Sequence, residues 1–341
     1  MRKSLLAVLF LAAVGSATAQ VQLKDGHPDT YTVVRGDTLW DISGKFLSQP
    51  WQWPEIWHAN PQVKNPHLIY PGDRLSLVYI DGKPRLMLNR GESRGTVKLS
   101  PQVRSTPIAE AIPTIPLEAI NSFLLSNRVV NDEAEFNGAP YVVAGNAERV
   151  VSGIGDRIYA RGDFSQAQPA YGIYRQGKTY FDPETKEFLG INADDIGTAS
   201  MQADEGDIAT LTLTRTTQEV RLGDRLFPTE ERALTSTFVP SAPATSVNGV
   251  ILDVPRGVNQ VGQFDVVIIN KGARDGLSEG NVLAVYKTGE TVRDRITGDL
   301  VKIPDERSGL VMIFRTYEKL SYGLILNAQR QLAVMDKVRN P

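Results

Sequence analysis

The sequence predicts a multidomain α+β protein: a small βααβ module, then a linker, then a mainly β C-terminal region that is internally duplicated. Three observations support this prediction. Residues 31–79 contain two strand-like stretches that enclose two short helix-like stretches. Prolines recur between residues 84 and 116, which is typical of an extended linker. From about residue 141, short apolar stretches alternate with turn residues, and one pattern recurs after 112 residues.

The first nineteen residues have the pattern of an export signal. Arg2 and Lys3 form a positive end, residues 5–14 form an apolar core, and Ala17-Thr18-Ala19 is a cleavage motif. Because no cysteine follows this motif, we expect no lipid anchor of the lipoprotein type. No other long apolar run follows, so we expect no transmembrane segment after cleavage.

The charge and the lack of cysteine limit which partners and which means of stabilisation are expected. The chain has 37 Lys and Arg residues against 39 Asp and Glu residues, with no basic cluster. Nucleic acid is therefore not an expected partner, because phosphate binding needs concentrated positive charge. With no cysteine, an exported protein depends on its apolar cores rather than on disulfides.

The first module, residues 28–80, has local signals for each of its elements. Residues 31–34 favour a strand, and Thr38 followed by Asp41 fits a capping box at the start of a helix. A second helix is expected near Pro54, because proline suits the first helical turn. The predicted inward-facing residues of the helices and of the closing strand are Leu39, Ile42, Phe46, Ile56, Ala59, Leu75, Leu77 and Tyr79.

The motifs of this module resemble those of a LysM domain, a small fold that binds N-acetylglucosamine-containing glycans such as peptidoglycan. They read Tyr31-Thr-Val-Val-Arg-Gly-Asp-Thr-Leu-Trp40, Trp53-Pro-Glu-Ile-Trp57-His-Ala-Asn60-Pro and Leu68-Ile-Tyr-Pro-Gly72-Asp. The resemblance implies a shallow glycan groove between two loops. The residues it assigns to glycan binding are Gly36, Asp37, Thr38, Leu39, Asn60, Leu68, Ile69, Tyr70 and Pro71.

Some of these residues, and the tryptophans near them, also have a purely structural interpretation. Asp37 could serve only to close the turn that precedes the helix. The four tryptophans, Trp40, Trp51, Trp53 and Trp57, are expected in the core rather than in the groove.

The remainder is divided into a linker with short strands (residues 81–116), a short helix with a connecting segment (117–145), and two β units (146–228 and 248–341) joined by residues 229–247. Each unit is expected to be a small barrel or sandwich. Identical residues recur 112 positions apart at Tyr174 and Tyr286, Asp182 and Asp294, Thr185 and Thr297, Gly197 and Gly309, and Asp224 and Asp336. The turn Gly272–Gly280 before an apolar strand resembles the C-terminal domain of the flagellar protein FlgT.

The sequence gives little sign of catalysis, so we expect a protein that is not an enzyme and that uses no cofactor or metal. Without cysteine there is no thiolate nucleophile. The three histidines, His27, His58 and His67, lack metal-ligand spacing. The acidic pairs Asp194-Asp195 and Asp204-Glu205 are interpreted as solvated turn residues.

The order of the parts resembles the type IV pilus secretin-associated proteins (TsaP) over most of the chain. That resemblance implies a periplasmic anchor in a Gram-negative cell, holding peptidoglycan at one end and the outer-membrane secretin at the other. A cell-wall hydrolase, a hydrolase regulator and a general envelope scaffold remain alternatives. Because the segment from Ser100 to Pro116 is predicted to be extended, we also expect the two ends to move as separate bodies.

Overall fold

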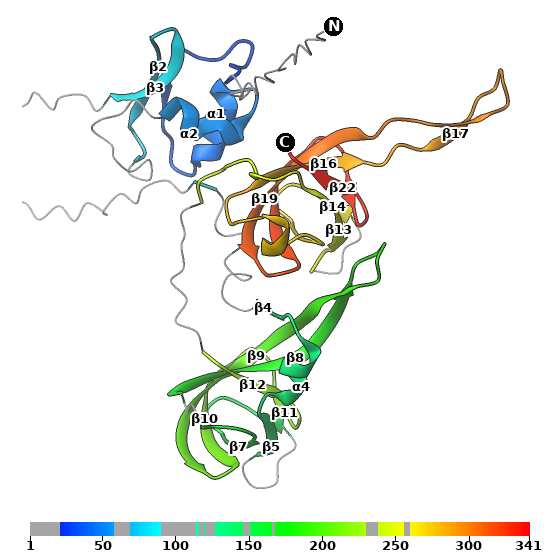
Figure 1. Ribbon diagram of the computed structural model, residues 1–341. Coiled ribbons are helices and arrows are strands. Elements are labelled where there is room, and N and C mark those ends of the chain that lie inside the picture. The colour runs from blue at the N-terminus through cyan, green and yellow to red at the C-terminus, as the bar shows by residue number, and fades with distance from the viewer. Residues whose placement is uncertain are drawn as a thin grey trace, which may run out of the picture.

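A computed structural model describes residues 21–57, 69–89, 114–115, 120, 127–145, 151–165, 168–229, 238–255 and 260–341. These residues form an N-terminal unit and two β-barrels (Figure 1). Within these ranges no helix is long and apolar enough to cross a membrane. The predicted export signal and the helix predicted after Pro116 lie outside the described residues, apart from Ile120, which is fully buried.

The N-terminal unit consists of a three-stranded sheet packed against short helices. Its elements are β1 (Thr30–Thr32), α1 (Leu39–Phe46), η1 (Pro50–Gln52), α2 (Trp53–Trp57), β2 (Arg74–Ile80) and β3 (Lys83–Asn89). The strand order is β1-β2-β3, and all pairs are antiparallel. The sequence placed β3 in the linker, yet Leu86 and Leu88 belong to the core of this unit. The unit therefore extends beyond residue 80.

The helical stripe predicted from the sequence forms the centre of that core. Leu39, Ile42 and Phe46 are all buried, together with Ile56 on α2 and Leu75 on β2. Tyr79 is the exception, since 62% of it is exposed near the end of β2. Ala59 lies outside the described residues.

The first barrel lies between residues 141 and 228. Its strands are β5 (Tyr141–Gly145), β7 (Arg157–Arg161), β8 (Ala170–Phe181), β9 (Phe188–Glu205), β10 (Ile208–Thr216) and β12 (Arg225–Pro228). The sheet order is β10-β7-β5-β12-β8-β9, and β9 also pairs with β10, so the sheet closes on itself. The strand β4 (Asn127–Val130) extends the sheet at β9. Two small pieces complete the unit, the helix α4 (Glu133–Gly138) and the pair β6 (Val151–Ser152) with β11 (Val220–Arg221).

The second barrel is also closed, with the order β13-β15-β20-β19-β16-β22. These strands are β13 (Asn248–Asp253), β15 (Val266–Ile269), β16 (Val282–Lys287), β19 (Glu306–Thr316), β20 (Ser321–Ala328) and β22 (Lys337–Arg339). Smaller elements are β14 (Gln260–Val261), η3 (Ala273–Asp275), β17 (Thr291–Arg293), β18 (Leu300–Lys302) and β21 (Leu332–Ala333). β15 and β16 are apolar stretches: all four residues of β15 and the first four of β16 are buried.

The two barrels have the same strand order around the barrel. If the six strands of each barrel are numbered along the chain, both barrels have the cyclic order 1-2-5-4-3-6. Matched residues make matched interactions. Arg175 pairs with Asp224 at 2.7 Å, and Lys287 pairs with Asp336 at 3.3 Å. Each of these aspartates also accepts a backbone N–H three residues before it, from Arg221 at 2.8 Å in one barrel and from Ala333 at 2.8 Å in the other. Both aspartates therefore hold a turn together.

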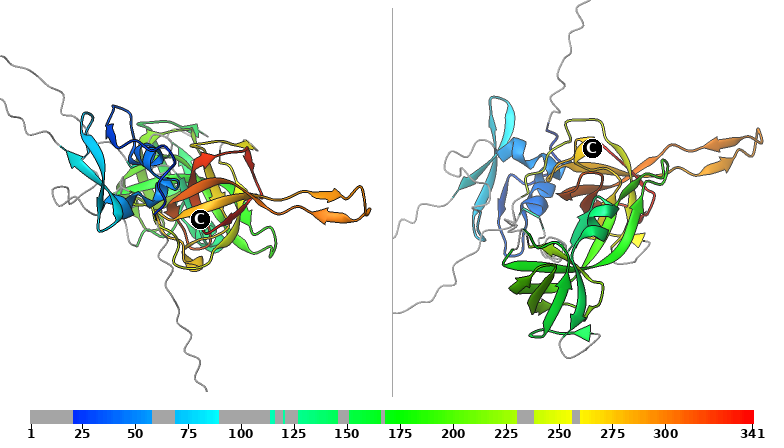
Figure 2. Two further views of the ribbon diagram at one scale, coloured as in Figure 1. Left: turned by 90° about the horizontal axis from the view of Figure 1, so that it is seen from above. Right: turned by 60° about the horizontal axis from the view of Figure 1, so that its bottom comes forward.

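Each barrel carries a hairpin arm, which we define as residues 178–190 in the first barrel and residues 290–302 in the second. The tips have equivalent hydrogen bonds: Asp182 N donates to Glu187 O and Asp294 N donates to Asp299 O, both at 2.8 Å. The first arm packs on the second barrel, where Tyr180 and Leu189 are buried. The second arm, β17–β18, projects away from its barrel (Figures 1 and 2).

The N-terminal unit also packs on the second barrel. Trp40 on α1 is 4% exposed and shares a core cluster with Leu310, Leu326 and Ile115. The backbone N–H of Trp40 donates to Thr114 O at 3.1 Å, so the end of the predicted linker lies within this contact. The expectation that the two ends move as separate bodies is therefore wrong, because a tryptophan of one unit completes the apolar cluster of the other.

Candidate functional site

The loop between β1 and α1 is organised by Asp37. Its Oδ2 accepts the backbone N–H of Val34 at 2.8 Å and the hydroxyl of Tyr31 at 3.0 Å. Burial, followed by the Asp37 carboxylate, raises the pKa of Tyr31 above its ordinary value. Gly36 has φ +96°, a backbone conformation that favours glycine. Asp37 thus performs the turn-closing role that the sequence left open, with its side chain still half-buried.

The start of α1 is fixed by the predicted capping box. Asp41 N donates to Thr38 Oγ1 at 3.1 Å, and Thr38 N donates to Asp41 Oδ2 at 3.3 Å. This reciprocal pair satisfies two backbone donors at the helix start. It sets where the β1–α1 loop ends and where the helix begins.

The second loop, just before β2, lies directly beside the first. Val33 N donates to Asp73 O and Gly72 N donates to Val33 O, both at 2.8 Å. Gly72 has φ +97°, and Tyr70 N donates to Asp73 Oδ2 at 3.0 Å. Two loops about forty residues apart in the chain are thereby held together, as the glycan-groove prediction requires.

The residues predicted to contact the glycan differ in what they can offer. Gly36 and Pro71 are exposed, and Tyr70 is half-buried. Thr38, Leu39 and Ile69 are buried, so they could act on a ligand only through backbone groups. Asn60 and Leu68 lie outside the described residues. The groove assignment as a whole stays a prediction.

Sequence reasoning missed the part played by two tryptophans. Trp53 and Trp57 lie in the N-terminal core as expected. Trp40 and Trp51 instead pack into the cluster shared with the second barrel. No local signal could have shown this, since Trp40 sits on the same helix as the core residues and most of its cluster comes from residues 266–326.

The acidic pairs do not form a catalytic arrangement in the described residues. Asp194-Asp195 and Asp204-Glu205 all lie in strand β9, not in turns as expected. Arg215 donates to both Oδ atoms of Asp195 at 2.8 Å, and Asn192 donates to Asp194. Burial raises the pKa of Asp194. These are contacts of a strand surface, and no group of three or more potential metal ligands occurs in the parts of the chain that the structure describes.

Comparison with known proteins identifies the N-terminal unit. Residues 31–78 match the LysM domain family. This is a LysM domain. The chain is also 40% identical over 60 residues to the uncharacterized protein YqbP of Bacillus subtilis (strain 168). That alignment covers 15% of this chain and 27% of YqbP, so the chain spans only about a quarter of that relative. The LysM domain supports binding of peptidoglycan or a related carbohydrate, and it is a binding domain rather than a catalytic one.

Proposed function

We propose that this chain is a non-catalytic protein of the Gram-negative periplasm that binds peptidoglycan through its LysM domain and holds the outer-membrane secretin of a type IV pilus near the cell wall. The main support for glycan binding is that the two LysM loops lie side by side, joined by backbone hydrogen bonds of Val33 with Gly72 and Asp73. Backbone groups and the half-buried Tyr70 beside an exposed Pro71 suit a neutral acetamido sugar. The periplasmic location rests on the export-signal pattern of residues 1–19.

The support for a protein partner is the second arm. Ile296 is 95% exposed and Leu300 is 73% exposed, on a two-stranded ribbon that no other described strand extends. Isolated ribbons are marginal in water, and exposed apolar patches commonly mark interaction sites. We assign the secretin contact to this arm.

The common strand order and matched interactions of the two barrels also support an origin by internal duplication. On this proposal, both barrels inherited an arm, and the two arms later took different partners: the second barrel for one, and another protein for the other.

Glycan binding is tested by co-sedimentation of the full chain with purified peptidoglycan. Replacing Tyr70 with Ala should remove most of the sedimented protein, while the matched control Tyr79→Ala should sediment like wild type, because Tyr79 is exposed on β2 away from the two loops. Circular dichroism must show that both variants fold. Equal sedimentation of the two variants would contradict the groove assignment.

Partner binding is tested by co-purification of the secretin from envelope extract. The double variant Ile296→Ser/Leu300→Ser should recover far less secretin than wild type. The control Leu222→Ser changes an apolar residue that is 49% exposed on the first barrel, and it should recover the same amount as wild type. Clearing of a cell-wall suspension by the pure protein would instead favour the hydrolase alternative.

A further inference from the structure

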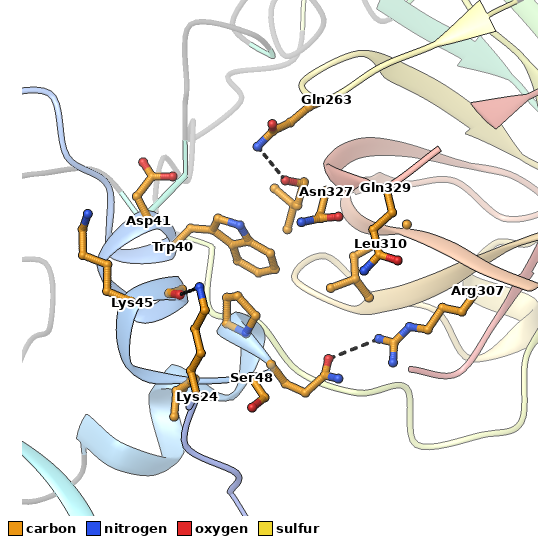
Figure 3. A pocket seen from close by; sticks show the side chains of 16 residues that line it. Lys24, Trp40, Asp41, Lys45, Ser48, Gln263, Arg307, Leu310, Asn327 and Gln329 are labelled. Atoms are coloured by element: carbon orange, nitrogen blue, oxygen red, sulfur yellow. Dashed lines mark hydrogen bonds between the residues drawn. The ribbon is translucent and has the colours of Figure 1, made fainter. Parts of the chain in front are cut away.

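A cavity of about 580 Å³ lies between the LysM domain and the second barrel. Its volume falls within the range of small-molecule binding sites. One wall is formed by α1, by η1 and by Lys24 ahead of β1. The other wall is formed by β19, by β20 and by Gln263. Figure 3 shows Trp40, Lys24 and Lys45 on the LysM side, with Arg307, Leu310 and Gln329 opposite. The cavity is separate from the predicted groove loops, none of whose residues line it.

The base of this cavity is held in place by the packing of the two units. Trp40 is almost fully buried in the cluster that includes Leu310 and Leu326. Arg307 Nη2 donates to Gln49 Oε1 at 3.2 Å across the boundary, and Gln263 Nε2 donates to Leu326 O at 3.1 Å. The walls therefore have a defined spacing, although they come from segments more than 200 residues apart.

The charge of the lining favours an anion. Three cations, Lys24, Lys45 and Arg307, line the cavity with a single acid, Asp41. Among the described residues none of these cations forms an ion pair with a carboxylate. Lys24 donates to the backbone carbonyl of Gly44 at 3.3 Å, and Lys45 lies 4.9 Å from the ring centre of Tyr31. Concentrated unpaired positive charge in a concave site attracts negatively charged ligands.

The remaining polar lining is rich in amides. Four carboxamide side chains line the cavity: Gln49, Gln263, Asn327 and Gln329. Carboxamides donate and accept hydrogen bonds, so they match hydroxyl, acetamide and peptide groups equally well. Trp40 and Pro50 add apolar surface to the same cavity. A ligand that matches the cations, the carboxamides and the apolar surface of this cavity carries carboxylates, amides and a compact apolar part.

We propose that this cavity is a second glycan site, which binds the carboxylate-bearing, peptide-substituted sugar of peptidoglycan. The inference rests on the proposed peptidoglycan function and deepens it. The LysM loops take the neutral acetamido sugar. The cavity takes the acidic portion of the same polymer. Together the two sites would distinguish peptidoglycan from neutral polymers of N-acetylglucosamine.

The test uses isothermal titration of the full chain with two probes, a soluble disaccharide-peptide released from peptidoglycan and a neutral chitin oligomer. The variants are Lys24→Ala/Arg307→Ala, and Gln329→Glu, which adds a negative charge with almost no change of shape. Both should bind the disaccharide-peptide at least tenfold more weakly than wild type, with chitin binding unchanged. Arg295→Ala, which removes an exposed cation at the tip of the second arm, is the matched control and should change neither affinity.

The outcomes separate the two proposals. Wild-type affinity of both cavity variants for the disaccharide-peptide overturns the cavity proposal and leaves the LysM groove standing. Binding of the disaccharide-peptide that depends on Arg307, without any chitin binding, overturns the groove and keeps the cavity. A wild-type protein that binds neither probe overturns both. Arg307 also contacts Gln49, so the double variant removes a contact between the two units. Gln329→Glu keeps that contact, so its affinity for the disaccharide-peptide decides the question where the two variants differ.

Discussion

The two barrels share a strand order but differ in what covers their outer faces. In the first barrel, β10 alternates, with Leu211 and Leu213 inside and Thr210 and Thr212 outside. In the second barrel, β15 and β16 are buried on both faces. Val267 and Leu283 point into the barrel, while Val266 and Val282 belong to the cluster that includes Trp40 and Leu189. Strands covered on both faces become continuous apolar runs, and strands with one wet face alternate.

The arms differ in the same way. In the first arm, Glu187 contacts Arg274 at 2.6 Å and Lys319 at 3.1 Å, both on the second barrel. Asp182 accepts from Asn270 Nδ2 at 2.8 Å, and Lys178 contacts Asp253 at 2.7 Å. The second arm has the same tip turn but no such contacts among the described residues. The hairpin arm therefore forms an internal joint in the first barrel, whereas in the second it makes no such joint within the described part of the chain.

The largest expected effect on stability comes from placing a charge at equivalent positions of the two arms, Leu189 in the first and Val301 in the second. Leu189→Asp places a charge in a fully buried site between the barrels, so it should lower the free energy of unfolding by more than about 3 kcal/mol. Val301→Asp, at the equivalent position of the second arm, is 46% exposed and should change it by less than about 0.5 kcal/mol. Urea denaturation measures both. Similar losses in the two variants would mean that the second arm is also docked.

A smaller effect should follow from exchanging matched residues on the outer barrel faces. Leu324→Thr removes a fully buried apolar side chain and buries a hydroxyl, at a cost of roughly 2–3 kcal/mol. Thr212→Leu, at the equivalent position of the first barrel, lies on a half-buried face and should cost less than about 1 kcal/mol. Thermal unfolding of the two variants checks the difference. Equal destabilisation would contradict the idea that the packing of other segments on a barrel face, rather than the strand order, determines how well that face tolerates substitution.

The smallest effect concerns pH. The hydrogen bonds from Arg274 and Lys319 lower the pKa of Glu187 from 4.5 to about 2. A carboxyl with a lowered pKa in the folded state contributes stability above its unfolded pKa, and this contribution is lost as pH falls from 4.5 towards 2. Wild type should therefore lose more stability across this window than Glu187→Gln. Asp299→Asn, at the matching position of the second arm, should show the wild-type slope. A Glu187→Gln variant with an unchanged slope would show that this ion pair does not form in solution.

Local chemistry explains why much of the molecule could be predicted. The capping box of Thr38 and Asp41 and the apolar stripe of α1 depend on neighbours within about four residues, and the structure confirms them. The 112-residue spacing likewise matched Asp224 with Asp336, and in the structure each of them holds a turn together. The sequence could not decide between a barrel and a sandwich, because closure of a barrel depends on which distant strands pair.

The sequence by itself determined the first strand, the two short helices and the LysM character of residues 31–78, since these rest on backbone preferences and short-range hydrogen bonds. Only the tertiary structure decided where Trp40 and the two arms lie. Trp40 and Leu189 are buried by partners far away in the chain, and a side chain carries no local mark of a contact formed across such a distance. The same holds for the cavity between the LysM domain and the second barrel, because its charge arises when Lys24 and Arg307 are brought to one place by packing.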